Sequence, residues 1–294
     1  MLKRATEQFP LRFTRRLVPF KGHEKDPAQN GTTVQELRHV GLHIAANIAV
    51  ITVRRPNKMN AINAGMWVDL TETVQRASRD ERVRALVIRG EGDSFSTGSD
   101  LKELGRSSLP QVEDIFHRME ECAATVEESP LPSIACIRGY ALGTGLLLAL
   151  ACDLRIADNS ATLGMPIARL GITLTEPFVK RLVSLIGPAR MKDLVYTGRL
   201  IDASEALRWG LVNRVVDEDR SVLRETLRVA DVITRQSSAS ITAAKRWGGS
   251  GSGRVPAMYN YVDPEDFPEG VRAFLERRKP QFRRTGRTPA HAKR

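Results

Sequence analysis

The fold is decided by two stretches of sequence, Phe95-Ser-Thr-Gly-Ser-Asp-Leu-Lys-Glu103 and Ile137-Arg-Gly-Tyr-Ala-Leu-Gly-Thr-Gly145. Each is a glycine-bearing loop that follows a short apolar strand pattern and opens into a helical pattern. Such a loop leaves unpaired backbone N–H groups at a helix start, where the helix dipole favours negative charge. Two such donors from separate loops can form an oxyanion hole.

Neither loop carries a nucleotide-binding motif. GxGxxG followed by an acidic residue on the next strand and GxxxxGK[ST] are both absent. A tight connection is the alternative interpretation of any single glycine-rich turn, but two such loops at matching places after strands favour a shared site.

Around these loops, strand and helix patterns alternate. Apolar runs predict strands and residues at helical spacing predict helices, with Asn63 as a cap candidate. This rhythm predicts an α/β protein whose strands are buried on both faces. The expected strands are two runs within 40–53 that turn at Ala46-Asn47, then 85–88, 133–137 and 153–157, and the expected helices are 66–78, 110–128 and 145–151. Beyond residue 200 the helices expected are 204–209, 221–235, 240–247 and 268–278.

Length and composition describe a globular protein. The 294 residues, 41% of them hydrophobic, suffice for one large domain or one domain with an appendage. The longest apolar run, Tyr140–Cys152, is interrupted by glycines and is too short for a spanning helix, so we expect no membrane partner.

The net charge of +11 is concentrated at the two ends. Residues 1–25 hold seven Lys/Arg and two acids, residues 271–294 hold nine and one, and the body between them is nearly neutral. Without stacking aromatics or a nucleic-acid-binding motif, this pattern indicates solubilising tails and no nucleic-acid partner. Residues 1–33 are expected to be a basic, disordered extension; a transit peptide and a start codon placed too early are the alternatives.

Cysteines and histidines do not indicate a disulfide framework or a metal site. Cys122, Cys136 and Cys152 share no CxxC spacing, and the five histidines are scattered. We therefore expect a reducing, cytoplasmic location and no metal.

Six collinear segments resemble the successive signatures of the enoyl-CoA hydratase/isomerase (crotonase) family. They are Arg55-Pro-Asn-Lys-Met-Asn-Ala-Ile62, the two loops quoted above, Ala151-Cys-Asp-Leu-Arg-Ile-Ala157, Tyr196-Thr-Gly with 203–216, and 265–282. The resemblance implies a crotonase-like spiral of ββα units over residues 34–199 and a helical trimerisation region over 200–282, followed by a basic tail at 283–294. It also implies homotrimers, often paired into hexamers, and acyl-CoA thioester substrates, with coenzyme A present only as part of the substrate and no separate cofactor.

The same resemblance implies a site. The thioester oxygen, as it becomes an enolate, would be held by the backbone N–H groups of Ser99 and Thr144. Thr144 stands where the family usually has glycine, a departure that could restrict the bound geometry. Substrate-binding residues would be Ser99, Asp100, Leu101, Lys102, Leu147 and Ile167. Lys102 would face the phosphate end of CoA, or else is a solvated lysine at a helix start.

The two glutamates that hydratases of this family carry are missing. Their positions hold Leu147 and Ile167, which cannot exchange protons, so hydration by the family's usual route is not expected. Glu176 is the candidate acid/base in their place, with a pKa raised by an apolar pocket lined by those two side chains. Its alternative role is a first-turn acid at a helix N-terminus.

Two other candidates are weaker. His117 lies on the helix after the first loop and is either a pocket residue or a surface histidine. Arg169 is a substrate-carboxylate clamp or a surface ion-pair partner, and Asp153 and Asp158 flank a strand in structural positions.

The sequence thus predicts an acyl-CoA-binding, enolate-stabilising protein. An isomerase-type enzyme using one base, or a decarboxylase or thioester hydrolase, fits better than a hydratase. The alternative is a non-catalytic acyl-CoA-binding or regulatory member of the family.

Overall fold

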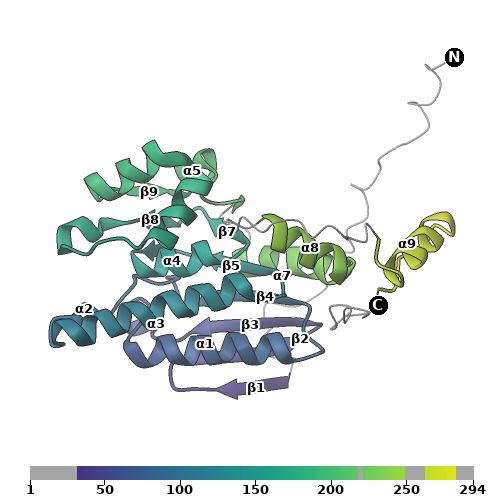
Figure 1. The fold of residues 1–294 in the computed structure, drawn as a ribbon, viewed down its shortest axis with the longest axis horizontal. Helices are drawn as coiled ribbons and strands as arrows, with labels where there is room; N and C mark the ends of the chain where they lie inside the picture. Colours follow the sequence, from purple (N-terminus) through teal and green to yellow (C-terminus); the bar gives the residue numbers. More distant parts are fainter. Residues whose placement is uncertain (1–31, 218–220, 249–261, 283–294) are drawn as a thin grey trace, which may run out of the picture.

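The computed structural model describes residues 32–217, 221–248 and 262–282 and contains a seven-stranded sheet in the order β1-β2-β3-β4-β5-β7-β10 (Figure 1). β1, β2 and β3 are antiparallel, and every later pairing in this sheet is parallel. The strands are β1 Thr32–Glu36, β2 Val40–Ala45, β3 Ile48–Val53, β4 Ala85–Gly90, β5 Ser133–Ile137, β7 Leu154–Asp158 and β10 Arg214–Val216. A smaller sheet joins β6 Tyr140–Leu142, β8 Thr162–Gly164 and β9 Leu200–Asp202.

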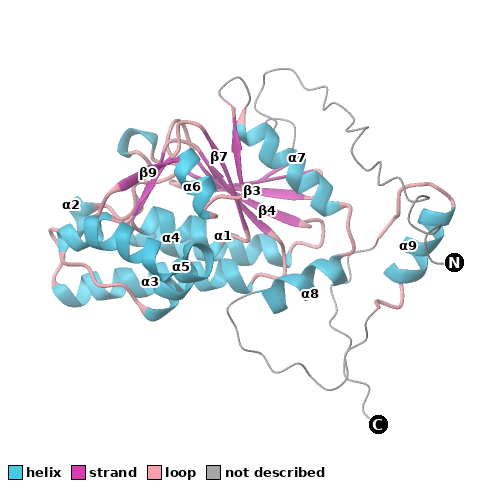
Figure 2. Ribbon diagram, turned by 90° about the horizontal axis from the view of Figure 1, so that it is seen from above, coloured by secondary structure: helices cyan, strands magenta, loops and turns pink. Residues whose placement is uncertain are grey.

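Helices cover both faces of the large sheet (Figure 2). They are α1 Ala64–Arg79, α2 Leu101–Leu104, α3 Leu109–Glu128, α4 Thr144–Ala151, α5 Glu176–Thr197, α6 Ala203–Trp209, α7 Val222–Thr234, α8 Ser238–Gly248 and α9 Asp266–Leu275, with short 3₁₀ turns η2 Pro56–Lys58 and η3 Pro166–Leu170. All the strands and helices that the sequence predicts are present, with ends shifted by a few residues.

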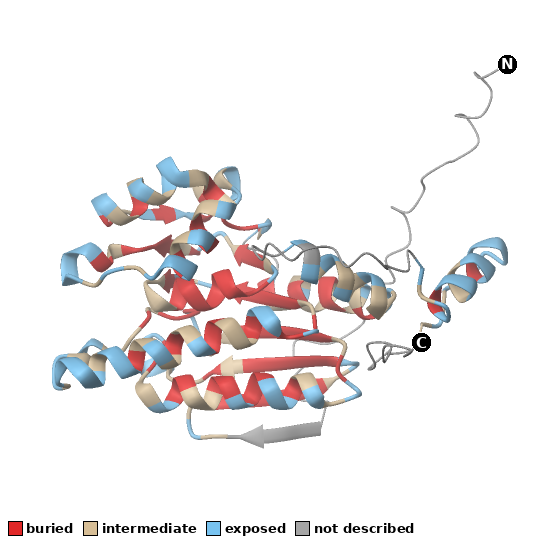
Figure 3. Cartoon of the chain, viewed as in Figure 1, coloured by how far each residue is buried: buried red, intermediate tan, exposed pale blue. Residues whose placement is uncertain are grey.

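The period of two in each strand divides the core into two layers. In β4, Leu86 and Ile88 pack with α1, α3 and α4, whereas Ala85 and Val87 face α7. Figure 3 shows the buried residues concentrated on the strands and on the parts of the helices that pack against them. The prediction of an α/β protein with strands buried on both faces is confirmed.

Local side-chain chemistry sets the first turns. Ala46 and Asn47 both adopt positive φ in the tight β2–β3 turn, and the Asn47 amide donates to Arg82 O at 2.8 Å. Asn63 Oδ1 accepts from the N–H of Met66 at 2.9 Å, which confirms it as the N-cap of α1.

Several elements have no clear sequence signal. α5 is broken internally at Gly187, which has φ of 77°, and Pro188 follows, so its hydrophobic pattern does not continue. β6, β8, β9 and β10 have three residues each, too few to show a period of two. The region predicted as helical, 200–282, therefore also contains two strands, and β10 forms an edge of the main sheet.

The predicted ends of the chain lie mostly outside the described residues. Residues 1–31 and 283–294 are among those not described. Thr32 and Thr33, which the sequence analysis assigns to the extension, begin β1 and pair with β2. None of the described helices is both long and apolar enough to span a bilayer.

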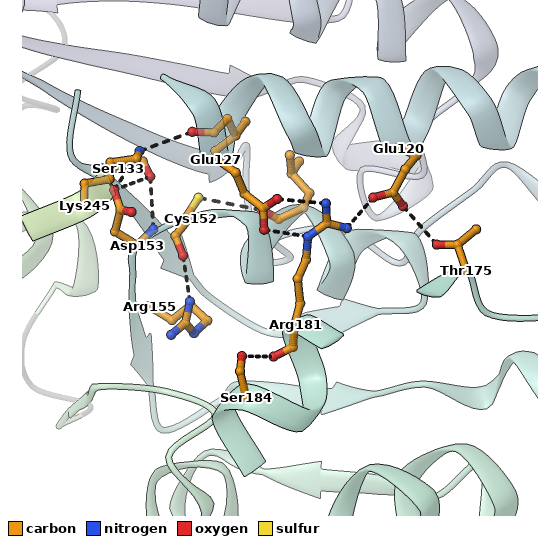
Figure 4. Close-up of polar contacts among 12 residues, drawn as sticks. Glu120, Glu127, Ser133, Cys152, Asp153, Arg155, Thr175, Arg181, Ser184 and Lys245 are labelled. Atoms are coloured by element: carbon orange, nitrogen blue, oxygen red, sulfur yellow. Dashed lines mark hydrogen bonds and ion pairs between the residues drawn. The ribbon is translucent and has the colours of Figure 1, made fainter. Parts of the chain in front are cut away.

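A buried lysine fastens α8 to the core. Lys245 Nζ donates to Leu131 O at 2.8 Å and pairs with Asp153 Oδ2 at 2.9 Å (Figure 4). The same Asp153 oxygen accepts from the N–H of Ser133 at 2.7 Å. Asp153 is therefore a structural carboxylate, as its position beside a strand predicts.

Arg181 joins α5 to α3. Its guanidinium is 6% exposed and makes a bidentate pair with Glu127, at 2.6 and 2.9 Å, and a third contact with Glu120 at 2.6 Å (Figure 4). Glu120 also accepts from the Thr175 hydroxyl at 3.3 Å, at the start of α5. The cluster fixes the N-terminal half of α5 against the helix that follows the first loop.

We predict that Arg181→Met destabilises the fold by about 2 kcal/mol, because two carboxylates lose their counter-charge. The value is below that of a fully buried pair because Glu127 is 38% exposed. Arg235→Met is the control: Arg235 pairs with Asp231 on an exposed helix face, and its loss should cost under about 0.5 kcal/mol. Urea unfolding measures both, and equal effects of the two substitutions would contradict the prediction.

Candidate active site

The two glycine-bearing loops lie side by side and bond to each other. Ser96 N–H donates to Tyr140 O at 2.9 Å, and Leu142 N–H donates to Ser96 O at 3.0 Å. The residues thus form a parallel bridge between Ser96 and Ala141. The tertiary fold therefore brings together the two segments that the sequence marks as one site.

A buried asparagine supports the first loop. The side-chain amide of Asn60 donates to Glu91 O at 2.8 Å and Ser94 O at 2.6 Å, while its Oδ1 accepts from the N–H of Arg55 at 2.8 Å. The Asn60 carbonyl accepts from the Ser96 hydroxyl at 2.8 Å. The sequence pattern includes Asn60 in the Arg55–Ile62 motif and predicts no separate role for it. Its position between the apolar Met59 and the apolar pair Ala61-Ile62 was the available signal.

An ion pair holds the end of the first loop. Arg55 Nη2 lies 3.0 Å from Asp100 Oδ2, both side chains being largely buried, and Arg55 Nη1 donates to Ala61 O at 2.8 Å. Asp100 also caps α2 by accepting from the N–H of Lys102 at 3.0 Å. Burial acts to raise the pKa of Asp100, but the hydrogen bonds from Arg55 and Lys102 outweigh it and the pKa is lowered. Asp100 therefore stays charged and holds the loop.

The backbone N–H of Ser99 points away from Ile62, the residue with which Ser99 forms a parallel bridge. Ile62 N–H donates to Gly98 O at 2.8 Å, and Asp100 N–H donates to Ile62 O at 3.0 Å. Since successive backbone groups of an extended segment point to opposite sides, the intervening N–H of Ser99 points away from Ile62.

The N–H of Thr144 belongs to the first turn of α4, where no acceptor exists within the helix. A Cβ atom placed on Gly98 would lie 3.1 Å from Thr144 N, so the two loops are in contact at this point. The hydroxyls of Ser99 and Thr144 are 3.1 Å apart. Ser99 and Thr144 are thus neighbours, and Thr144 lies at the positive end of the α4 dipole, a position that favours negative charge.

Comparison with known proteins agrees with this arrangement. The family model for enoyl-CoA hydratase/isomerase matches residues 43–285. A probable enoyl-CoA hydratase of Mycobacterium leprae is 35% identical over 246 residues, which cover 80% of this chain and 94% of that protein. The crotonyl-CoA hydratase of Syntrophomonas wolfei is 34% identical over 245 residues, with the same shares covered. The chain belongs to the enoyl-CoA hydratase/isomerase family.

Solved structures of the family agree on the fold. The enoyl-CoA hydratase from Bacillus anthracis superposes with a TM-score of 0.76 at 29% identity, covering 84% of this chain and 99% of that one. The family and the crotonase-like fold expected from the six sequence segments are therefore confirmed.

Leu147 and Ile167, which the sequence resemblance places at the positions of the two hydratase glutamates, are apolar and buried. Leu147 lies on α4, three residues after Thr144, and Ile167 lies in η3 directly after Pro166. Both belong to the main hydrophobic core. Neither side chain can transfer a proton, and a carboxylate would have to replace core packing there.

Glu176 is not in an apolar pocket. It is the first residue of α5, its side chain is 77% exposed, and it pairs with Lys180 at 2.7 Å. The hydrogen bond from Lys180 lowers the pKa of Glu176, so the expected rise is wrong. The physical reason is the helix start: the i,i+4 lysine and the helix dipole both favour the charged, solvated carboxylate. Its role as acid/base stays a prediction.

The remaining predicted site residues lie nearer the surface. His117 is exposed on α3, three residues before the Glu120 that contacts Thr175, so it and Glu176 lie at the same α3–α5 junction. Arg169 is exposed in η3. Leu101 and Lys102 are exposed at the start of α2, directly after the Ser99 loop. The structure groups Ser99, Asp100, Leu101 and Lys102 with Thr144; the binding roles stay predictions.

We predict that Gly98→Ala costs about 3 kcal/mol of stability, against about 1 kcal/mol for Gly171→Ala. Both glycines have positive φ, so both substitutions strain the backbone, but only at Gly98 would the new Cβ meet Leu142 O at 2.8 Å and Thr144 N at 3.1 Å. At Gly171 nothing lies within 4 Å. Free energies of unfolding in urea measure the difference. Equal losses would show that the loops separate without cost.

Proposed function

We propose that this protein binds an acyl-CoA thioester and stabilises the enolate formed from it. The observation that carries the proposal is the contact between Ser99 and Thr144, which come from two separate loops and whose hydroxyls lie 3.1 Å apart. Negative charge that develops on the thioester oxygen is stabilised there by two preorganised donors and by the start of α4.

The CoA moiety would extend along the segment that follows Ser99. Asp100 is held by Arg55 and therefore shapes the loop, whereas Leu101 and Lys102 present their side chains to solvent. Lys102 offers a cation for the CoA phosphates. Leu147 and Ile167 would lie on the apolar side of the acyl group. Coenzyme A enters as part of the substrate.

The reaction proposed is proton transfer at the thioester Cα rather than hydration. Hydration needs positioned groups to activate water and to deliver a proton, and Leu147 and Ile167 occupy the positions where hydratases of the family carry them. Isomerisation of a double bond needs one base. Decarboxylation and thioester hydrolysis would use the same hole.

A second candidate function is acyl-CoA binding without turnover. The exposed Glu176–Lys180 pair favours it, because the best carboxylate candidate faces solvent in the described structure. The two functions share the hole and differ in whether any base reaches the substrate Cα.

We predict that the protein binds acetyl-CoA and exchanges the Cα hydrogens of butyryl-CoA in D₂O, followed by NMR, while crotonyl-CoA hydration is absent or very weak. Each missing acid/base group lowers the hydration rate by roughly 10² to 10⁴ fold. Binding without exchange would select the non-catalytic function. Hydration at ordinary enzyme rates would contradict the mechanism.

Glu176→Gln tests the candidate base. If Glu176 removes the Cα proton, exchange falls by roughly 10² fold or more while acetyl-CoA affinity is kept, because the amide retains size but cannot accept the proton. Asp231→Asn is the control, since it neutralises another exposed helix carboxylate that pairs with an arginine four residues on. Unchanged exchange in Glu176→Gln would return Glu176 to a helix-start acid and make His117 the next residue to test.

We further propose a homotrimer, alone or paired into a hexamer. Apolar side chains at helical spacing on α9 are exposed in the single chain, namely Phe267, Val271, Phe274 and Leu275. Figure 3 shows α9 mostly exposed, beyond α8. The side chain of Trp247, in α8, lies outside the described part of the structure.

Light scattering at micromolar concentration should give three or six times the 32.6 kDa chain mass. Replacing Phe274 and Leu275 with Ser should lower this mass, because it removes apolar area from the exposed stripe. A monomeric mass for the unmodified protein would contradict the proposal.

A further inference from the structure

The two residues of the proposed oxyanion hole also touch through their side chains. Ser99 Oγ and Thr144 Oγ1 lie 3.1 Å apart, across the contact between the two loops. Both residues are only partly buried, so the pair can be reached by a ligand. A glycine at position 144, usual in the family, would have no such hydroxyl.

The hydroxyl of Thr144 lies on the same side of the residue as its N–H donor atom. A Cβ atom placed on Gly98 would be 3.1 Å from both Thr144 N and Thr144 Oγ1. Both atoms of Thr144 therefore face the loop that carries Ser99. The hydroxyl of Thr144 therefore lies close to its own backbone donor, at the contact with the Ser99 loop.

One hydroxyl hydrogen remains uncommitted in this arrangement. Each hydroxyl has one hydrogen and can accept as well as donate, and a single hydrogen bond between the two uses only one of the hydrogens. Within the described part of the chain, the bond between Ser99 and Thr144 is the one hydrogen bond made by either hydroxyl. The second O–H is free to donate to a bound molecule.

We propose that Thr144 Oγ1–H is a third hydrogen-bond donor to the substrate oxygen and that Ser99 Oγ–H, by donating to Thr144, orients it. This rests on the proposed function. When Ser99 donates, rotation about the Cβ–Oγ1 bond lets the Thr144 hydrogen point to the acceptor of its own N–H. Thr144 would then be a catalytic residue through its side chain, and Ser99 a positioning residue as well as a backbone donor.

A third hydrogen-bond donor stabilises a negatively charged oxygen more than a neutral carbonyl oxygen. A neutral thioester carbonyl has two lone pairs, which the two backbone N–H groups already satisfy. An enolate or tetrahedral oxyanion carries a full negative charge and gains from an additional donor. The Thr144 hydroxyl thus stabilises the charged state more than the neutral substrate, which is the condition for lowering the barrier.

The test uses acetoacetyl-CoA, whose enolate has its own ultraviolet absorbance. Titration of the bound ligand reports the pH at which half of it is enolate and needs no base from the protein, because solvent accepts the proton. We expect Thr144→Val to reduce the enolisation constant of bound ligand roughly tenfold or more, and Thr144→Ser to keep it near the unmodified value. Ser99→Ala should reduce it less, on the order of twofold.

Affinity for acetyl-CoA, which presents a neutral carbonyl, should stay within about twofold in Thr144→Val. If the valine variant does not fold, as judged by its melting curve, Thr144→Gly removes the same hydroxyl and should give the same shift.

The outcomes separate this inference from the proposed function. If the unmodified protein binds acetoacetyl-CoA without favouring its enolate, the enolate function fails. If it favours the enolate and Thr144→Val and Thr144→Gly leave the constant unchanged, the hole stands with two donors and the third is refuted. A larger loss in Ser99→Ala than in Thr144→Val also overturns the assignment to Thr144.

Discussion

The close approach of residues 98–99 to residues 142–145 is the constraint on which the site depends. A Cβ at Gly98 would lie 2.8 Å from Leu142 O, and one at Gly145 would lie 2.4 Å from Ser96 O, so both positions require a residue without a side chain. This proximity brings Ser99 and Thr144 into contact, as our proposal requires. The rest of the fold serves to hold the two loops together.

Three sets of polar contacts maintain that approach. Asn60 fixes the start of the first loop through its buried amide, and the Arg55–Asp100 pair fixes its end. Farther away, Arg181 links α5, the helix that begins at Glu176, to α3. Since each set uses buried or half-buried groups whose partners are all protein atoms, loss of one partner leaves the other unsatisfied in a poorly solvated place.

The chain combines a retained scaffold with altered chemistry. The loops, the helix start and the family fold are present, but Leu147 and Ile167 are part of the hydrophobic core. In our proposal, this site polarises a thioester but lacks the groups that add water to it. In our proposal, the hydroxyls of Ser99 and Thr144 strengthen the hole in compensation, which suits a ligand whose oxygen becomes fully charged.

The sequence alone determined the family, the α/β alternation and the pair of loops, because glycine positions, strand runs and helix caps are local signals with local causes. It also predicts that Leu147 and Ile167 replace the two hydratase glutamates. Tertiary structure decided what depends on contacts between distant segments: the buried role of Asn60, the Arg181 cluster, and the contact of Ser99 with Thr144. It also decided that Glu176 faces solvent. A glutamate before a proline at a helix start has the same local sequence pattern whether its side chain enters a pocket or pairs with Lys180. Side-chain direction follows from packing between elements, which no local pattern records.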